Sequence, residues 1–247
     1  MPENIVNQGQ DNLGEADTLT MTLFHSALRR DLERARIVLS TPSIPSRKRR
    51  RLGRHLQWVT HVLRWHHEGE DHYLWPLLIE RAPEDRAVFD ALEAEHESID
   101  EPLLRLEAAA RGLVAGRVEP AGAVEALEAL EVPLLSHLAH EEGEGMRIVS
   151  RVLSHREWEF FEQRAWIDGF TLFETIRFFS WLCDGVRWTN RLRQRAGFPI
   201  ALGPLLRPLS AIARVPGISV WAGSTSAAVK SCVDIAEPTR GTQTGQK

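Results

Sequence analysis

Four histidines occupy positions where a helical pattern of apolar residues would otherwise place leucine. They are His25, His66, His96 and His137. Two of them have a glutamate four residues later, so that His66 pairs with Glu70 and His137 with Glu141. Residues four apart lie one above the other on a helix, and such a pair can supply two ligands to one metal ion. The residue types and their spacing therefore indicate metal binding by imidazole and carboxylate groups.

Four long helices are expected to position these residues. Apolar residues recur in steps of three and four, which predicts one buried stripe per helix. The pattern runs over residues 18–39, 47–80, 84–115 and 120–153. Proline or glycine marks each short break between the segments, and short connections favour antiparallel neighbours. The sequence thus predicts an all-α, up-down-up-down four-helix bundle followed by a C-terminal helical extension.

Two observations strengthen the prediction of a shared site. The periodicity continues through Pro76, Pro102 and Pro133, so we expect the helices to be continuous despite the missing backbone donors. Each of the four histidines also stands at a similar number of residues from the adjoining turn, which places all four at a similar height in the bundle. A purely hydrogen-bonded polar layer is the alternative, but unpaired buried imidazoles and carboxylates are costly.

The number of candidate ligands favours a pair of ions. Besides the four histidines and two glutamates, further candidates stand nearby, namely His67, Asp71, Asp100, His140 and Glu142. This set exceeds the four ligands of a tetrahedral zinc site, and imidazole with carboxylate suits iron or manganese. Ferritin-like bundles use two Glu-x-x-His motifs, whereas Glu93 with His96 is the single match here.

Several segments together resemble the hemerythrin-like, HHE cation-binding family. The segment from His66 to Pro76 is similar to the family signature HHxxE[ED]xxL[FW]P. The other family elements match, in order, at Phe24-His25, Glu95-His96 and His137 to Glu142. The resemblance covers roughly residues 18–153. It implies a four-helix bundle that holds a non-haem di-iron centre.

The resemblance also implies a ligand set, with two iron ions as the cofactor. By motif match the ligands are His25, His66, Glu70, His96, His137 and Glu141, with the two glutamates bridging the ions. Oxygen-carrying members of the family have a second histidine ligand on the third helix, where this chain has Asp100. Their carboxylate ligand on the fourth helix stands five residues after the histidine, a position that corresponds to Glu142 rather than Glu141. A carboxylate in place of an imidazole favours oxidised metals. We therefore expect oxidation chemistry, peroxide turnover or redox sensing rather than stable reversible O2 carriage.

Residues beside the motif have two interpretations each. His67 and Asp71 form a second pair four residues apart, which either orients the ligands or faces solvent. Tyr73, the only tyrosine, stands one turn from Glu70 and either donates to a metal-bound ligand or simply packs. Asp100, His140 and Glu142 are further candidates for supporting roles.

Composition limits the other possibilities. The chain has 247 residues, ten histidines and two cysteines, which argues against a disulfide scaffold and leaves a reducing cytoplasm as the simplest location. The sequence contains neither an apolar stretch long enough to span a membrane nor an apolar signal core. The basic run Arg47–Arg54 is interpreted as a solvated helix start, so no nucleic-acid partner is expected.

Charge divides the chain into an acidic and a basic part. Residues 1–155 carry 18 basic and 26 acidic side chains, whereas residues 156–247 carry 12 and 8. We expect a flexible N-terminus at 1–17, the bundle at 18–155, an aromatic-rich extension at 156–236 and a disordered tail at 237–247. The extension should open with one long amphipathic helix from Trp158 to Val186. This helix has three interpretations. In order of preference, it packs on the bundle, forms a homodimer surface or lies on a membrane surface.

Three functions fit these expectations. The first is an enzyme in which a di-iron centre reacts with a small molecule, O2, hydrogen peroxide or nitric oxide. The second is a sensor in which iron loading or oxidation is reported to a partner through the extension. The third, metal storage, ranks lower because one closed site holds few ions.

Overall fold

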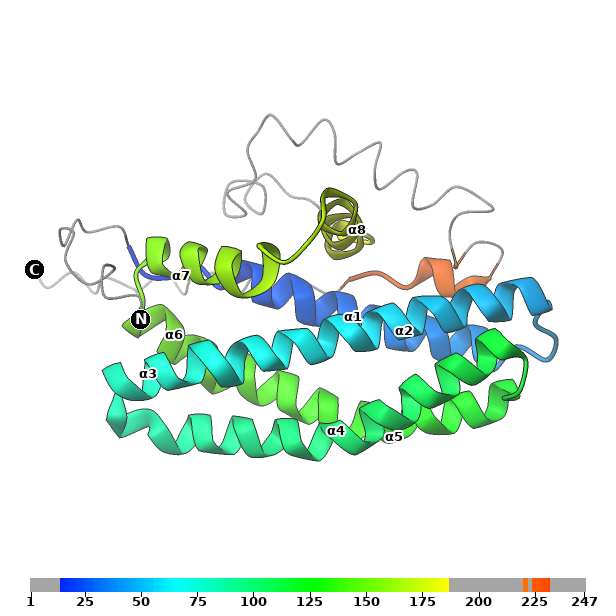
Figure 1. The fold of residues 1–247 in the computed structure, drawn as a ribbon, viewed down its shortest axis with the longest axis horizontal. Helices are drawn as coiled ribbons and strands as arrows, with labels where there is room; N and C mark the ends of the chain where they lie inside the picture. The colour runs from blue at the N-terminus through cyan, green and yellow to red at the C-terminus, as the bar shows by residue number, and fades with distance from the viewer. Residues whose placement is uncertain (1–13, 187–219, 222–223, 232–247) are drawn as a thin grey trace, which may run out of the picture.

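The computed structural model describes residues 14–186, 220–221 and 224–231. Within these ranges the regular elements are helical, and four long helices pack side by side as an antiparallel bundle (Figure 1). The predicted four-helix bundle is therefore confirmed. The expected tail at 237–247 lies outside the described residues.

The four bundle helices match the predicted ranges closely. They are α1 (Leu19–Leu39), α2 (Ser46–Gly69) with its continuation α3 (Trp75–Arg81), α4 (Arg86–Ala115), and α5 (Pro120–His140) with its continuation α6 (Met146–Val152). A single 3₁₀ turn, η2 (Pro83–Asp85), joins α3 to α4. Helix α4 packs against α2 and α5, and α1 packs against α5. Pro102 and Pro133 lie inside α4 and α5 without ending them.

Two of the bundle helices contain a π-helical turn that the sequence pattern did not predict. These turns are η1 (Glu70–Leu74) and η3 (Glu141–Gly145), and each begins at a glutamate of the expected site. The backbone N–H of Trp75 donates to the carbonyl of Glu70, and that of Met146 donates to Glu141, five residues earlier in each case. Such turns occur often at functional sites because they re-aim side chains within an otherwise regular helix.

The apolar core is divided into two clusters. One fills the bundle along α1, α2, α4 and α5 and includes Leu63 and Ile99. The other fills the end formed by α3 and α6 and includes Leu74 and Leu92. The apolar stripe of the bundle helices thus continues on both sides of the polar residues. Burial of these side chains supplies the main driving force for folding.

The extension is not the single helix that was expected from Trp158 to Val186. It forms α7 (His155–Glu162), a π-helical turn η4 (Gln163–Ile167) and α8 (Leu172–Cys183). The reason is local: a capping box at Thr171 and Glu174 begins a new helix just after Gly169. Another capping box, at Ser154 and Glu157, begins α7. Both Ser/Thr-x-x-Glu signals are present in the sequence.

The extension packs on the bundle, as the first of its three interpretations proposed. Helix α8 contacts α1 (Figure 1). The π-helical turn η4 contacts α2. Close to the N-terminus, Ala16 donates its backbone N–H to the carbonyl of Leu153 at 3.2 Å. Residues 14–17, which were expected to be flexible, are therefore attached to the end of α6.

The structure describes one chain, and the homodimer stays a prediction. No helix in the described ranges is long and apolar enough to cross a membrane.

A buried group of charges, which we call the clasp, attaches α8 to α1. Its members are Arg30, Asp31, Arg34, His55, Trp181 and Asp184. The carboxylate of Asp31 is 1% exposed and accepts hydrogen bonds from Arg30 at 2.9 Å, His55 at 2.6 Å and Trp181 at 2.8 Å. Burial opposes ionisation of Asp31, but Arg30, His55 and Arg34 outweigh it and lower its pKa. Arg34 in turn binds Asp184 at 2.5 Å.

Replacement of Asp31 should loosen the extension. In Asp31→Asn the cations Arg30 and Arg34 lose a buried counter-charge, and removing one partner of a buried ion pair costs about 3–5 kcal/mol. Chemical denaturation should show this loss, and limited proteolysis should cleave first near α8. Asp90→Asn, an exposed residue that pairs with Arg86, is the control and should change little. Equal stability of the two variants would contradict the role of the clasp.

Glu162 on α7 predicts a pH dependence of stability. Its carboxyl is largely buried, which raises its pKa to about 8. The folded chain therefore keeps a proton that the unfolded chain loses above its ordinary pKa of 4.5, and stability falls as the pH rises from there to about 8. Glu162→Gln should raise the melting temperature at pH 8.5 and flatten this dependence. The exposed Glu84→Gln should leave the profile unchanged, and a Glu162→Gln profile parallel to wild type would refute the assignment.

Candidate metal centre

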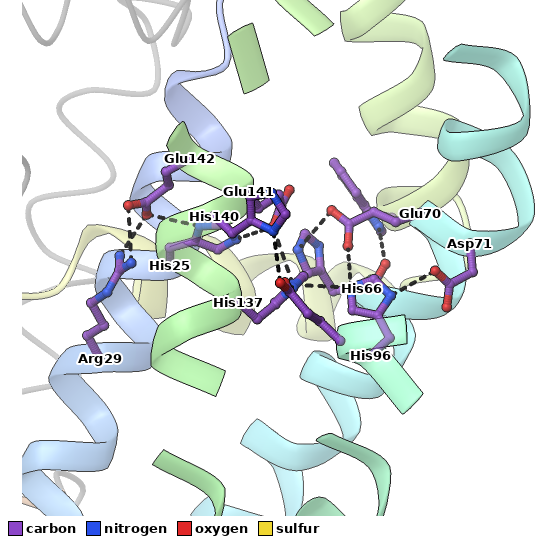
Figure 2. Close-up of polar contacts among 12 residues, drawn as sticks. His25, Arg29, His66, Glu70, Asp71, His96, His137, His140, Glu141 and Glu142 are labelled. Carbon is purple, nitrogen blue, oxygen red and sulfur yellow. Dashed lines mark hydrogen bonds and ion pairs between the residues drawn. The ribbon is translucent and has the colours of Figure 1, made fainter. Parts of the chain in front are cut away.

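Seven buried side chains from the four bundle helices meet in one layer between the two apolar clusters. They are His25 on α1, His66 and His67 on α2, Glu70 at the start of η1, His96 on α4, His137 on α5 and Glu141 at the start of η3. Each is 6% exposed or less. Figure 2 shows six of them, all but His67, labelled and turned toward one another, with charged residues around them.

The layer contains two separate groups of three ligands. The first is His25, His66 and Glu141, and the second is His67, His96 and His137; within each group the ligand atoms lie within 4.8 Å of one another. A third group, Glu70, His137 and Glu141, overlaps both regions. The layer therefore offers two neighbouring positions for a cation.

Each glutamate contacts one histidine from each group. Oxygen Oε1 of Glu70 lies 3.2 Å from Nε2 of His66, and Oε2 lies 3.6 Å from Nε2 of His96. Oxygen Oε2 of Glu141 lies 3.1 Å from Nε2 of His25 and 3.7 Å from Nε2 of His137. Both carboxylates are thus placed to bridge two ions.

The atoms that face inward fit a cation. Within the described part of the chain, Nε2 of His25, His66 and His67 and all four oxygens of Glu70 and Glu141 are buried without a hydrogen-bond partner. A buried polar atom that is left without a partner costs about 1–3 kcal/mol. Coordination by a cation is the physical arrangement that satisfies lone pairs on every one of them at once.

Burial keeps most of the imidazoles neutral, the form that binds metal. It lowers the pKa of His66 and of His67 well below the usual value, and it lowers that of His137 to about 4. Burial would also lower the pKa of His25, but Glu141 and Glu142 outweigh it and raise that pKa. Of the four inner histidines whose pKa is shifted, His25 is therefore the one whose charged form the metal-free layer favours.

The two glutamates differ in protonation. Burial, followed by the negative charge of Glu141, raises the pKa of Glu70 well above its usual value. Burial acts the same way on Glu141, but the nearby His25, His137 and His66 reverse the effect and lower its pKa. The negative charge of one buried carboxylate disfavours ionisation of the other, so the pKa of Glu70 is raised while that of Glu141 is lowered. A bound cation would favour the ionised form of both.

An outer set of carboxylates orients the histidines. Nδ1 of His96 donates to Asp71 at 2.7 Å, and Nδ1 of His25 donates to Glu142 at 3.0 Å (Figure 2). Nδ1 of His137 donates to Glu95 at 3.0 Å. Glu95 also accepts from His140 at 2.8 Å. A hydrogen bond from Nδ1 fixes the tautomer and directs Nε2, the nitrogen that would bind a cation, toward the layer.

The extension covers one side of the layer. The ring of Trp166 in η4 lies 5.0 Å from that of His66, and the ring of Phe24 lies 4.2 Å from it. A Cβ at Gly69 would come within 2.5 Å of the indole nitrogen of Trp166, so the close approach requires glycine there. These aromatic rings exclude water from the side of the site that faces the extension.

The structure brings together all six residues of the predicted ligand set. Of the supporting candidates, His67 lies in the inner layer, and Asp71, His140 and Glu142 lie in the outer set. Two candidates are not brought to the site: Asp100 is 64% exposed and pairs with Arg64 at 3.7 Å, and Tyr73 is 65% exposed.

The position of Asp100 corrects one expectation. The inner layer does not exchange an imidazole for a carboxylate, because His67 supplies the imidazole in place of the residue at 100. The greater negative charge that was expected from Asp100 therefore does not apply to the inner layer. Glu95 was missed as a supporting residue, although its place beside His96 in the motif was a usable signal.

The chain matches the family model described as the hemerythrin HHE cation binding domain over residues 18–147, more than half of its length. It therefore belongs to the hemerythrin HHE cation-binding family. Comparison with curated proteins and with solved structures finds no match. The family establishes a cation-binding helical bundle, and the buried histidines and glutamates are suited to that role.

Substitutions can distinguish the contribution to metal binding of the inner residue His67 from that of the outward-facing Asp100. His67→Ala removes one of three ligands at the second position and should lower metal affinity by about tenfold or more, as measured by competition with a chelator. Asp100→Ala is the matched control and should bind metal like the wild type. The opposite order of effects would mean that Asp100, one of the additional candidates from the sequence, acts at the metal and that His67 does not.

Proposed function

We propose that the chain holds two iron ions in the buried layer and that this centre binds or turns over O2, hydrogen peroxide or nitric oxide. The observation that carries the proposal is the placement of Glu70 and Glu141, each of which contacts one histidine from both groups of three. Two ions held apart by separate histidines and joined by shared carboxylates are the arrangement that this geometry suits.

The donor set supports iron among the common metals. Seven nitrogen and oxygen ligands exceed one zinc ion's needs, and the layer contains no thiolate among the described residues. His25, His66 and Glu141 would hold one ion, and His67, His96 and His137 the other, with Glu70 between them. Seven protein ligands with bridging carboxylates leave room for a small exogenous ligand.

When bound, iron supplies electrons for the reduction of a small oxidant. The residues of this chain have other tasks. Asp71, Glu95 and Glu142 keep the histidines in the correct tautomer, and Trp166 and Phe24 exclude water beside His66. Glu70, with its raised pKa, holds a proton in the metal-free layer and gives it up when a cation arrives.

Metal content tests the proposal. Protein from iron-supplied cells should contain close to two iron ions per chain. His66→Ala and Glu70→Ala should each lose most of the iron while circular dichroism stays helical, because the apolar clusters on both sides of the layer remain. His61→Ala, an exposed histidine on α2, is the control and should keep two ions. Metal-free or one-zinc wild-type protein would refute the di-iron proposal.

A sensor is the second candidate function, and one observation favours it. Trp166 of the extension packs directly on His66, so the extension and a predicted ligand share a contact. Assays of peroxide consumption and nitric oxide reduction by the iron-loaded protein, with ascorbate supplied as the electron donor, separate the two functions. Multiple turnovers that scale with iron content support an enzyme, whereas stoichiometric oxidation accompanied by exposure of Trp166, measured by fluorescence, supports a sensor.

A further inference from the structure

The buried layer needs a route by which ions reach it. All seven inner residues are 6% exposed or less, so an ion cannot arrive without movement of a side chain. The outer carboxylates are more accessible: the side chains of Asp71, Glu95 and Glu142 are 26%, 31% and 32% exposed. Each of them contacts one inner histidine, so each marks a place where the layer lies one residue from solvent.

Glu142 differs from the other two because an arginine from another helix holds it. Arg29 on α1 donates to both oxygens of Glu142, at 2.7 and 3.1 Å (Figure 2). Directly behind this pair stands His25, which is fully buried, with Nδ1 toward Glu142 and Nε2 toward Glu141. His25 alone therefore separates the Arg29–Glu142 pair from the other six inner residues.

The pair also divides two surface hollows along the groove between α1 and the α5–α6 helix. One hollow, of about 400 Å³, runs from Arg29 toward the end of α1 and is lined by Arg29, Leu32, Arg36, Glu128, Glu131 and Leu135, among others. The other, of about 340 Å³, lies on the opposite side and is lined by Thr18, Glu142, Met146 and Ser150, among others. Because the helices are antiparallel, Arg29 and Glu142 cross the groove between them.

Two features make this part of the wall easy to open. The side chains of Arg29 and Glu142 are about one-third exposed, at 33% and 32%, and ion pairs of this kind are weak. Glu142 also lies in the π-helical turn η3, whose backbone includes Gly143 and Gly145. A Cβ added at Gly143 would meet no heavy atom of the described residues within 4 Å, so the turn has space on its outer side.

We propose that the Arg29–Glu142 pair is the port through which iron enters and leaves the buried layer. Opening of the pair frees Glu142 to meet a divalent cation in the hollow and frees His25 to turn toward it. Closing returns His25 to Glu141. The inference rests on the proposed function, because it assigns a route to the same centre.

Uptake and release kinetics of Fe²⁺ test the port. Arg29→Met removes the pair but keeps the hydrogen bond between Glu142 and His25. A port predicts that uptake by the metal-free protein and release to a chelator, both measured without oxygen, become faster by the same factor, about two- to fivefold, the rate equivalent of an exposed ion pair. The stoichiometry and the equilibrium affinity should not change.

Arg36→Met is the matched control. Arg36 stands two turns further along α1, lines the same hollow and pairs with Glu33, far from His25. Its variant should load and release iron at the wild-type rates. Unchanged rates in Arg29→Met would overturn the port, and so would faster release with unchanged uptake, since that pattern means weaker binding. Wild-type protein that binds no iron would instead overturn the proposed function and, with it, the port.

Discussion

Burial of five imidazoles and two carboxylates in the middle of an apolar bundle is the constraint on which the rest of this structure depends. In the described structure their inward atoms are buried, and most have no hydrogen-bond partner. Such a layer is unfavourable in a chain that only needs to fold, because leucine at the same positions would join the clusters on either side. The arrangement is favourable once cations supply the missing interactions.

Other parts of the fold follow from that constraint. The π-helical turns begin at Glu70 and Glu141, so the two carboxylates leave the regular helix at the height of the histidines. The outer carboxylates are at the rim, where they are partly solvated and still reach Nδ1 of the ligands. The extension closes the remaining side through Trp166, and the clasp around Asp31 holds α8 in place by charge rather than by apolar contact alone.

Much of this organisation could be predicted from the sequence. Helical periodicity indicated the four bundle helices, and equal distances from the turns placed His25, His66, His96 and His137 at one height. These inferences succeed because each depends on the regular geometry of a helix. The rest depends on rotation about the helix axis and on contacts between distant segments. A rotation of each helix by a fraction of a turn decides whether His67 or Asp100 faces the layer. The π-helical turns change the rotation of the helix locally.

The extension illustrates the same limit. Its amphipathic pattern suggested one helix, but the capping box at Thr171 and Glu174 divides it, and the local signal prevails over the longer pattern. The clasp could not be predicted, because Arg30, Asp31 and Arg34 on a helix normally indicate a solvated face. Only the position of Trp181 and Asp184 shows that these charges are buried.

Whether the layer holds two bridged ions is the question that matters most for this protein. Anomalous X-ray diffraction at the iron absorption edge, from crystals of the iron-loaded protein, tests it most directly. We predict two peaks, one beside His25, His66 and Glu141 and the other beside His67, His96 and His137, with Glu70 and Glu141 between them. A single peak, or peaks outside this layer, would contradict the di-iron centre.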